Sequence, residues 1–149
     1  MKNVVKADQV IVNILSGLLI VLWVYAAGNK LMDLRTFEQQ LRLQYLPDGW
    51  APILLWLLPG AELVTAVLLI VPATVRMGLL LSAALLFVFS IYILLILNGL
   101  YKDIPCSCGG VFQHLSWPKH LIFNLTVLAF NIYCMVFHLK ERRLEENKL

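Results

Sequence analysis

Residues 77–97 read MGLLLSAALLFVFSIYILLIL, an apolar run without a charged side chain. About 20 apolar residues in helical conformation cross a hydrocarbon core of about 30 Å, so this run predicts a transmembrane helix. Three other runs of similar length cover about residues 10–27, 51–71 and 121–139. The sequence therefore predicts an all-α membrane protein, a four-transmembrane-helix bundle that forms one domain over residues 1–149.

The composition of the whole chain supports this fold class. Hydrophobic residues make up 60% of the chain and charged residues only 14%, whereas a soluble domain is about one quarter charged. The formal net charge is +3, and the basic residues are scattered except in the C-terminal tail. This distribution argues against nucleic acid as a partner. The expected surroundings are membrane lipid.

The first apolar run raises the alternative of a cleavable signal peptide, because Lys2 and Lys6 precede it and Ala26-Ala27-Gly28 follow it. A signal peptide has an apolar core of roughly 7–15 residues. The run at 10–27 is longer, and three more spans follow it. We therefore expect this segment to be retained as the first membrane helix.

The distribution of lysine and arginine beside the spans predicts the orientation, because cytoplasmic loops are enriched in both. Four spans place the two termini and the 72–76 turn on one side of the membrane. That side holds seven basic residues, namely Lys2, Lys6, Arg76, Lys140, Arg142, Arg143 and Lys148. The other side holds five, namely Lys30, Arg35, Arg42, Lys102 and Lys119. The balance favours both termini in the cytoplasm.

The first outward connection, residues 29–50, has apolar side chains at helical spacing. These are Leu31, Leu34, Phe37, Leu41 and Tyr45, and the charged Arg35, Glu38 and Arg42 face away from them. Such a pattern predicts an amphipathic helix that lies flat on the outer bilayer surface. A solvated loop is the alternative. Pro47-Asp48-Gly49 is expected to end the helix before the second span.

The second outward connection contains Ile104-Pro-Cys-Ser-Cys-Gly-Gly110. Two cysteines separated by one residue can have Cα atoms about 5–7 Å apart, within the range that a disulfide allows. The small ring is expected to be strained, and strained disulfides are the labile kind that exchange. Outside the cytoplasm thiol pairs tend to be oxidised. Cys106 and Cys108 are therefore predicted to form a redox pair.

Two other interpretations of this cysteine pair stay open. A structural disulfide could hold the surface loop in place. Alternatively Cys106, Cys108, His114 and His120 could bind a metal ion, with Cu(I) or Zn favoured by the soft sulfur ligands, although the spacing differs from the usual zinc patterns. The third cysteine, Cys134, lies in the fourth apolar run and is expected to be a buried apolar residue.

The second span carries one charge, Glu62. It lies about 16 Å along a helix that starts near residue 51, and a carboxylate at that depth suggests a functional site or a buried ion pair. Lys30 is the expected basic partner. Polar groups that could also face Glu62 are Asn13, Asn98 and Asn124.

A structural interpretation of Glu62 stands beside this functional one. Pro59-Gly60 directly precedes it. If the helix restarts there, Glu62 falls in a first helical turn, where a negative charge is favoured.

Three sequence blocks together resemble the DoxX superfamily of small four-helix membrane proteins. They are Tyr25-Ala-Ala-Gly-Asn-Lys-Leu31, Pro59-Gly-Ala-Glu-Leu63 and Pro72-Ala-Thr-Val-Arg76. The added block Cys106-Ser-Cys-Gly-Gly110 before the fourth span is similar to the MauE branch, the methylamine-utilisation proteins and their redox-associated relatives. The resemblance covers residues 10 to 138.

This resemblance implies a multi-pass protein of the bacterial inner membrane that assists disulfide formation or maturation of an exported client. In the methylamine system that client is the disulfide-rich small subunit of methylamine dehydrogenase. The cysteine loop is then expected on the periplasmic side. A thiol–disulfide oxidoreductase-like activity needs an electron partner, either a quinone or a thioredoxin-like protein, and the sequence contains no binding motif for either. The alternative is a non-catalytic membrane scaffold subunit with a structural disulfide.

Overall fold

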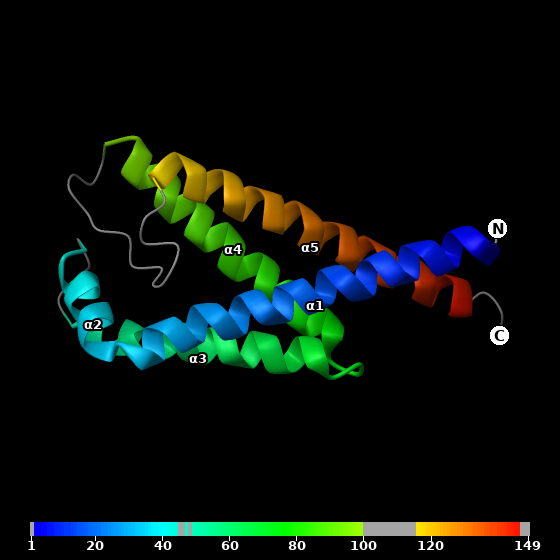
Figure 1. Ribbon diagram of the computed structural model, residues 1–149, viewed down its shortest axis with the longest axis horizontal. Coiled ribbons are helices and arrows are strands. Elements are labelled where there is room, and N and C mark those ends of the chain that lie inside the picture. Colours follow the sequence, from blue (N-terminus) through cyan, green and yellow to red (C-terminus); the bar gives the residue numbers. More distant parts are fainter. Residues whose placement is uncertain (1, 45–46, 48, 100–115, 147–149) are drawn as a thin grey trace.

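The computed structural model describes residues 2–44, 47, 49–99 and 116–146, and side chains from residue 9 to 140 within those ranges. The described chain is helical and contains no strand. Its helices are α1 (Lys2–Met32), α2 (Leu34–Arg42), α3 (Trp50–Ile70), α4 (Val75–Leu97) and α5 (Trp117–Glu146) (Figure 1). Within the described residues, four segments are long and apolar enough to cross a membrane: Gln9–Met32, Trp50–Ile70, Val75–Leu97 and Trp117–Lys140. The predicted all-α fold with four transmembrane helices is confirmed.

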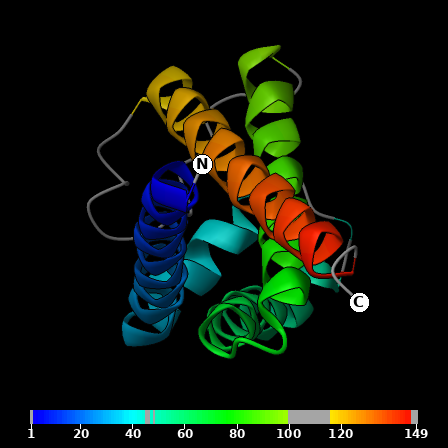
Figure 2. The same ribbon diagram turned by 90° about the vertical axis from the view of Figure 1, so that its right-hand side faces the viewer.

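The four long helices run up and down through one bundle. The α1 N-terminus, the α3–α4 turn and the α5 C-terminus lie at one end (Figure 1). The opposite end holds α2, the C-terminus of α4 and the N-terminus of α5. Helix α1 packs on α3 and α5, and α4 packs on α3 and α5. Seen from the end with both termini, the long helices surround a common interior and α2 lies at its far end (Figure 2).

Each long helix turns one narrow stripe to this interior, with most of its buried residues three or four positions apart or at multiples of that spacing. Helix α3 buries Pro59, Glu62, Thr65, Ala66 and Leu69. Helix α4 buries Gly78, Leu79, Ser82, Leu86, Ser90, Ile93 and Ile96. Large apolar side chains such as Leu18 and Val67 are exposed on the outer faces. In a membrane these outer faces contact lipid.

The first span is longer than predicted, and the amphipathic helix is shorter. Helix α1 continues past Ala27 to Met32, so Lys30 belongs to its last turn. The amphipathic helix α2 has nine residues, because Asp33 interrupts the helix and caps a new one. The side chain of Asp33 accepts a hydrogen bond of 3.1 Å from the backbone N–H of Thr36, as N-cap residues do.

Helix α2 packs against the bundle through its apolar side. Phe37 and Leu41 are buried, and α2 contacts both α1 and α3. On its outer face Arg42 forms an exposed ion pair with Glu38, at 2.7 Å. The helix therefore covers the interior of the protein with its apolar side and leaves its charged side exposed.

Helices α3 and α4 meet closely at the end of the bundle that carries the termini. Only residues 71–74 connect them. A Cβ atom added to Gly78 would lie 2.8 Å from the backbone nitrogen of Leu69. Real side chains essentially never come this close to a backbone atom. Glycine at position 78 is thus what allows the two helices to approach here, as small residues do in membrane bundles.

Candidate functional site: a buried ion pair on an aromatic cavity

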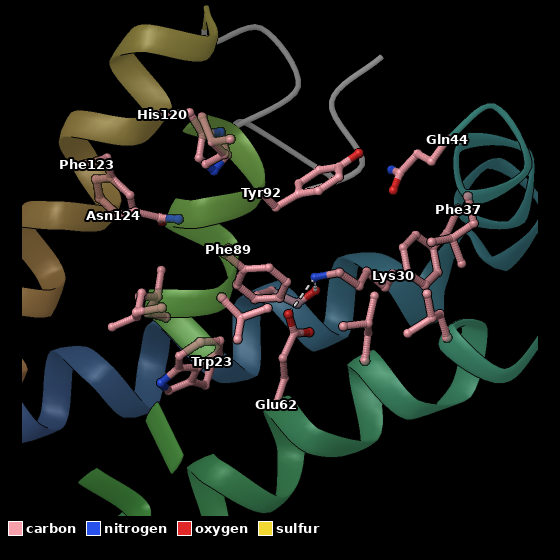
Figure 3. Close-up of a pocket in the computed structure, with 18 of the residues that line it drawn as sticks. Trp23, Lys30, Phe37, Gln44, Glu62, Phe89, Tyr92, His120, Phe123 and Asn124 are labelled. Carbon is pink, nitrogen blue, oxygen red and sulfur yellow. Dashed lines mark hydrogen bonds and ion pairs between the residues drawn. The ribbon is translucent and has the colours of Figure 1, made fainter. Parts of the chain in front are cut away.

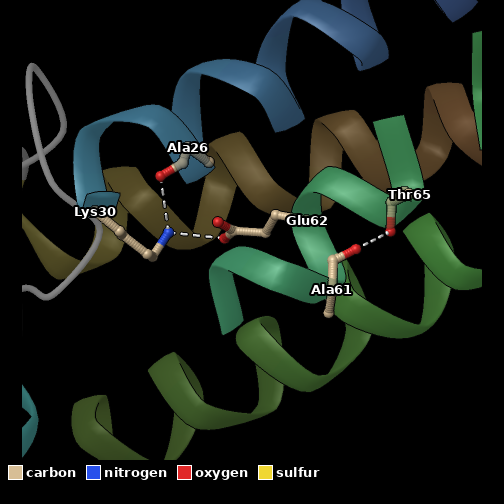
Figure 4. Close-up of polar contacts among 5 residues, drawn as sticks. All are labelled: Ala26, Lys30, Ala61, Glu62 and Thr65. Atoms are coloured by element: carbon tan, nitrogen blue, oxygen red, sulfur yellow. Dashed lines mark hydrogen bonds and ion pairs between the residues drawn. The ribbon is translucent and has the colours of Figure 1, made fainter. Parts of the chain in front are cut away.

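The main polar feature of the interior is an ion pair between Lys30 and Glu62. The Nζ atom of Lys30 lies 2.7 Å from Oε1 of Glu62 (Figure 4). The side chains are only 6% and 1% exposed. The same ammonium group donates a hydrogen bond of 3.2 Å to the carbonyl oxygen of Ala26, one turn earlier in α1. The structure thus brings together the two charged residues that the sequence singled out.

The position of Glu62 follows from the continuity of α3. The helix runs from Trp50 to Ile70 with Pro59 inside it, so the alternative in which a new helix starts beside Pro59 is wrong. Membrane helices tolerate an internal proline because neighbouring groups compensate the lost backbone bond. Glu62 is roughly 18 Å from the start of α3 at about 1.5 Å per residue. It therefore lies deep within the span.

An ion pair at this depth is costly to build. Charged groups inside a membrane are expensive, and by default they mark a functional site. Pairing recovers part of the desolvation cost, yet a buried pair is often no more stabilising than two apolar residues. Oε2 of Glu62 is fully buried and accepts no hydrogen bond from the described part of the chain. The carboxylate therefore has acceptor capacity beyond its bond to Lys30.

The ion pair lines a cavity of about 240 Å³ (Figure 3). All five helices contribute to the wall. Most of the wall is apolar, and its aromatic members are Trp23, Phe37, Phe89, Tyr92, Trp117 and Phe123. The ring of Phe37 lies 5.9 Å from Nζ of Lys30, within the range of a cation–π contact. A mostly apolar cavity with a few convergent polar groups is the usual form of a ligand site.

Helix α5 adds further polar side chains to the same cavity. His120 and Asn124, one turn apart, are 5% and 6% exposed and line the wall. Figure 3 shows both on the far side of the cavity from Lys30 and Glu62. The cavity thus has a charged pair on one side and two further polar side chains on the other.

A groove outside the bundle adjoins this cavity. It is lined almost wholly by apolar side chains of α1 and α5, namely Leu15, Leu18, Leu19, Val21, Leu22, Tyr25, Phe123, Val127 and Phe130. Leu22 and Phe123 line both the groove and the cavity. Leu18 is 60% exposed and Val21 66%, so the groove faces lipid.

A second polar cluster lies nearer the end with the termini. Oγ of Ser82 on α4 accepts hydrogen bonds from Nε1 of Trp23, at 2.9 Å, and from Nδ2 of Asn131, at 2.8 Å. All three residues are buried. This cluster ties α1, α4 and α5 together and does not line the cavity except through Trp23.

The other predicted site residues have different outcomes. Cys106, Cys108 and His114 lie outside the described residues. His120 lines the cavity, and the described residues contain no group of three side chains able to bind a metal. The redox and metal interpretations of these residues therefore remain predictions. Cys134 is fully buried among apolar neighbours, as expected.

Two of the polar groups suggested as neighbours of Glu62 lie elsewhere. Asn13 is on an exposed face of α1. Asn98 ends α4, and its side chain donates a hydrogen bond of 2.8 Å to the carbonyl oxygen of Leu94. Of the three asparagines, Asn124 alone lines the cavity.

The sequence analysis missed the cluster of Trp23, Ser82 and Asn131. A signal for part of it was present in α5, where the buried residues are His120, Asn124, Asn131 and Cys134. They follow a spacing of four, seven and three, which places them on one helix face. A stripe of polar residues on one face of a membrane helix indicates the side that packs against other helices.

A comparison with known protein families identifies one family that has this sequence pattern. The family model for "Methylamine utilisation protein MauE" matches residues 8–137, which contain all four membrane spans. Comparisons with curated proteins and with solved structures each gave no match. Since the family match covers most of the sequence, this chain is a multi-pass membrane protein that belongs to the MauE family.

Proposed function

We propose that this protein is a membrane accessory protein of methylamine utilisation that exchanges disulfides with an exported client through Cys106 and Cys108. Membership of the MauE family is the observation that carries the proposal. The cysteine pair in Ile104-Pro-Cys-Ser-Cys-Gly-Gly110 supplies the chemistry. A labile disulfide in a short ring exchanges readily with other thiols, so it is suited to passing a disulfide on to a client.

The position of the pair along the chain supports this function. Cys108 is nine residues after Gly99, near the end of α4, and nine residues before Trp117, where α5 begins. A chain of that length reaches at most about 30 Å. Tyr92 and Ile93 of α4 and Trp117 of α5 line the cavity. The described helix ends that flank the cysteine segment in the chain thus lie at the end of the bundle that holds the ion-pair cavity (Figure 1).

The proposed reaction is a thiol–disulfide exchange. A client thiolate attacks one sulfur of the Cys106–Cys108 disulfide, the bond between these sulfurs breaks, and a mixed disulfide forms. The second client thiolate then attacks this mixed disulfide. The client gains a disulfide, and the pair is left as two thiols after taking up two protons. Only the thiolate form of each attacking cysteine is reactive.

The test uses the small number of cysteines. The chain has three, and Cys134 is buried, so a Cys134→Ala background leaves the pair as the only thiols. In that background we expect Cys106→Ser and Cys108→Ser each to abolish maturation of the client, and one of them to trap a mixed disulfide that a reductant releases on a gel. Cys134→Ala alone is the matched control and should retain full function. Full activity in both serine variants, without a mixed species, would support the scaffold function instead.

A second measurement tests the proposed orientation, with both termini in the cytoplasm of a bacterial inner membrane. We expect an impermeant thiol reagent, added outside intact and reduced cells, to label the pair in the Cys134→Ala background. The double serine variant should not be labelled. Labelling that appears only after lysis would place the pair in the cytoplasm.

A further inference from the structure

The cavity that holds Lys30 and Glu62 has the features of a binding site for a lipid-soluble ring compound. We propose that it binds the head of an isoprenoid quinone or hydroquinone, with the apolar tail in the groove between α1 and α5. This inference names the electron acceptor for the proposed function and rests on that function for its redox step. The binding itself depends on neither cysteine.

The hydrogen-bonding capacity of the ion pair defines the polar part of the ligand. The ammonium group of Lys30 has three donors, and two of them serve Glu62 and the carbonyl of Ala26. The Oε2 atom of Glu62, in a side chain that is 99% buried, has no partner in the described chain. A ligand that accepts from Lys30 and donates to Glu62 would satisfy both groups. A hydroquinone hydroxyl does both, and a quinone carbonyl does the first.

The charge and shape of the cavity restrict the ligand further. The two charges of the pair balance, so the site favours a neutral molecule over an anion such as a phospholipid headgroup. The rings of Trp23, Phe37 and Phe89 are part of the wall (Figure 3), and aromatic side chains pack well against a flat ring. A volume of 240 Å³ equals about eight water molecules at roughly 30 Å³ each. This is enough for a small ring system and too little for a whole lipid.

The groove can accommodate the apolar tail of the ligand and provides a route into the cavity from the lipid. The groove shares Leu22 and Phe123 with the cavity, so a ligand with its ring in the cavity would have its tail next to the groove. Its remaining walls are apolar except for Tyr25, and it faces the lipid. A molecule dissolved in the bilayer can therefore reach the cavity sideways. Isoprenoid quinones combine a small polar ring with such an apolar tail.

The redox step balances without any other reactant. Two cysteine thiols give up two electrons and two protons and form a disulfide, and the quinone takes up the same electrons and protons and becomes a hydroquinone. Glu62 and His120, both on the cavity wall, are side chains able to pass protons to a ring oxygen. Oxidation by quinone would restore the Cys106–Cys108 disulfide after each transfer to the client.

Tryptophan fluorescence offers a direct binding assay with decylubiquinone as the probe. The chain has four tryptophans. Trp23 and Trp117 line the cavity, whereas Trp50 and Trp56 are exposed on the lipid side. In a Trp50→Phe, Trp56→Phe background the remaining fluorescence reports on the cavity. We expect purified protein in lipid nanodiscs to show saturable quenching by the probe.

Two sets of variants test where the probe binds. Lys30→Met with Glu62→Met removes both charges and should fold, since the loss of a complete buried pair is often neutral. We expect it to weaken binding at least about tenfold, the loss of one charge-assisted hydrogen bond. Glu38→Gln, which removes a carboxylate from the exposed pair on α2, is the matched control and should bind as the parent does. Val127→Phe, which changes a side chain of the groove but not of the cavity, should weaken binding of the tailed probe and spare a tailless benzoquinone.

The outcomes separate this inference from the proposed function. Quenching that does not saturate, or that the double charge variant leaves unchanged, overturns the quinone site. Persistence of a tightly bound phospholipid that the probe cannot displace, detected by native mass spectrometry, overturns it as well. If Cys106→Ser with Cys108→Ser binds the probe normally, the site stands whatever the fate of the exchange function. If binding fails while the cysteine variants still abolish maturation, the exchange function stands and uses another acceptor.

Discussion

The two ends of the bundle are built in different ways. At the end with α2, charged and aromatic side chains surround a cavity of about 240 Å³. Toward the other end Val12, Leu79, Asn131 and Cys134 are fully buried, and the backbones of α3 and α4 nearly touch at Gly78. The first region retains space beside its charged pair, and the second fills its space. The contrast indicates that the close-packed end holds the bundle together, whereas the cavity end is available to a ligand.

The largest effect should come from breaking the ion pair on one side. Lys30→Met leaves Glu62, deep in the span, buried without its counter-ion, which costs about 3–5 kcal/mol. Adding Glu62→Leu should restore much of the lost stability, because no charge then remains buried. Thermal unfolding in detergent of the two single variants and the double variant measures the coupling. Additive losses would show that the two side chains do not interact.

The close-packed end should respond sharply to added volume. Gly78→Ala places a methyl group 2.8 Å from the backbone nitrogen of Leu69, and overpacking of this kind costs about 1–3 kcal/mol. Gly60→Ala is the control, because a Cβ there meets nothing within 4 Å. Comparable unfolding temperatures for these two variants would mean that α3 and α4 are less closely packed than the structure shows.

The polar cluster should have a smaller effect. Ser82→Ala removes the acceptor shared by Trp23 and Asn131 and leaves two buried donors without it. Hydrogen bonds between membrane helices contribute about 0.6 kcal/mol on average and up to about 1.7. We expect a loss within that range, measured by detergent unfolding. Thr126→Ala is a suitable control, because this exposed hydroxyl bonds only to its own helix at Ile122.

The smallest effect concerns the cap of α2. The hydrogen bonds from Thr36 hold the pKa of Asp33 below its ordinary value. The cap therefore stabilises α2 fully above the ordinary pKa of aspartate and is lost as the pH falls through the lowered folded value. The protection factor of the Thr36 amide, which is its exchange rate relative to the intrinsic rate at the same pH, should fall in that acidic range. Asp33→Asn, which keeps the cap without a titrating group, should remove this pH dependence.

The membrane spans could be predicted from the sequence, and Glu62 could be identified as the one charged residue in the second span. Both follow from local signals, namely the hydropathy of a run and a charge within it. Sequence reasoning could not give the cavity, which depends on how five helices pack. It also placed Asn98 near Glu62, whereas this side chain caps α4 at the carbonyl of Leu94. Residues near each other in a simple drawing of the spans need not face the same interior, since a helix turns about 100° with each residue.

The hydrogen bond from Trp23 to Ser82 shows the same limit. The partners are 59 positions apart in the chain. Nothing in the residues around either one predicts that they form a hydrogen bond. Only the rotation of α1 relative to α4 brings them together. The length of α2 was misjudged for a different reason, because the capping tendency of Asp33 outweighed the longer apolar pattern around it.

The separation of Lys30 and Glu62 by 32 residues has a consequence for biogenesis. Helix α1 enters the membrane before α3 has been synthesised, so the lysine is without its carboxylate during insertion. Being in the last turn of α1, its ammonium group can extend to the water interface meanwhile. Once α3 is in place, its carboxylate lies 2.7 Å from that group and pairs with it. The ion pair can thus form only after the second hydrophobic segment has been made.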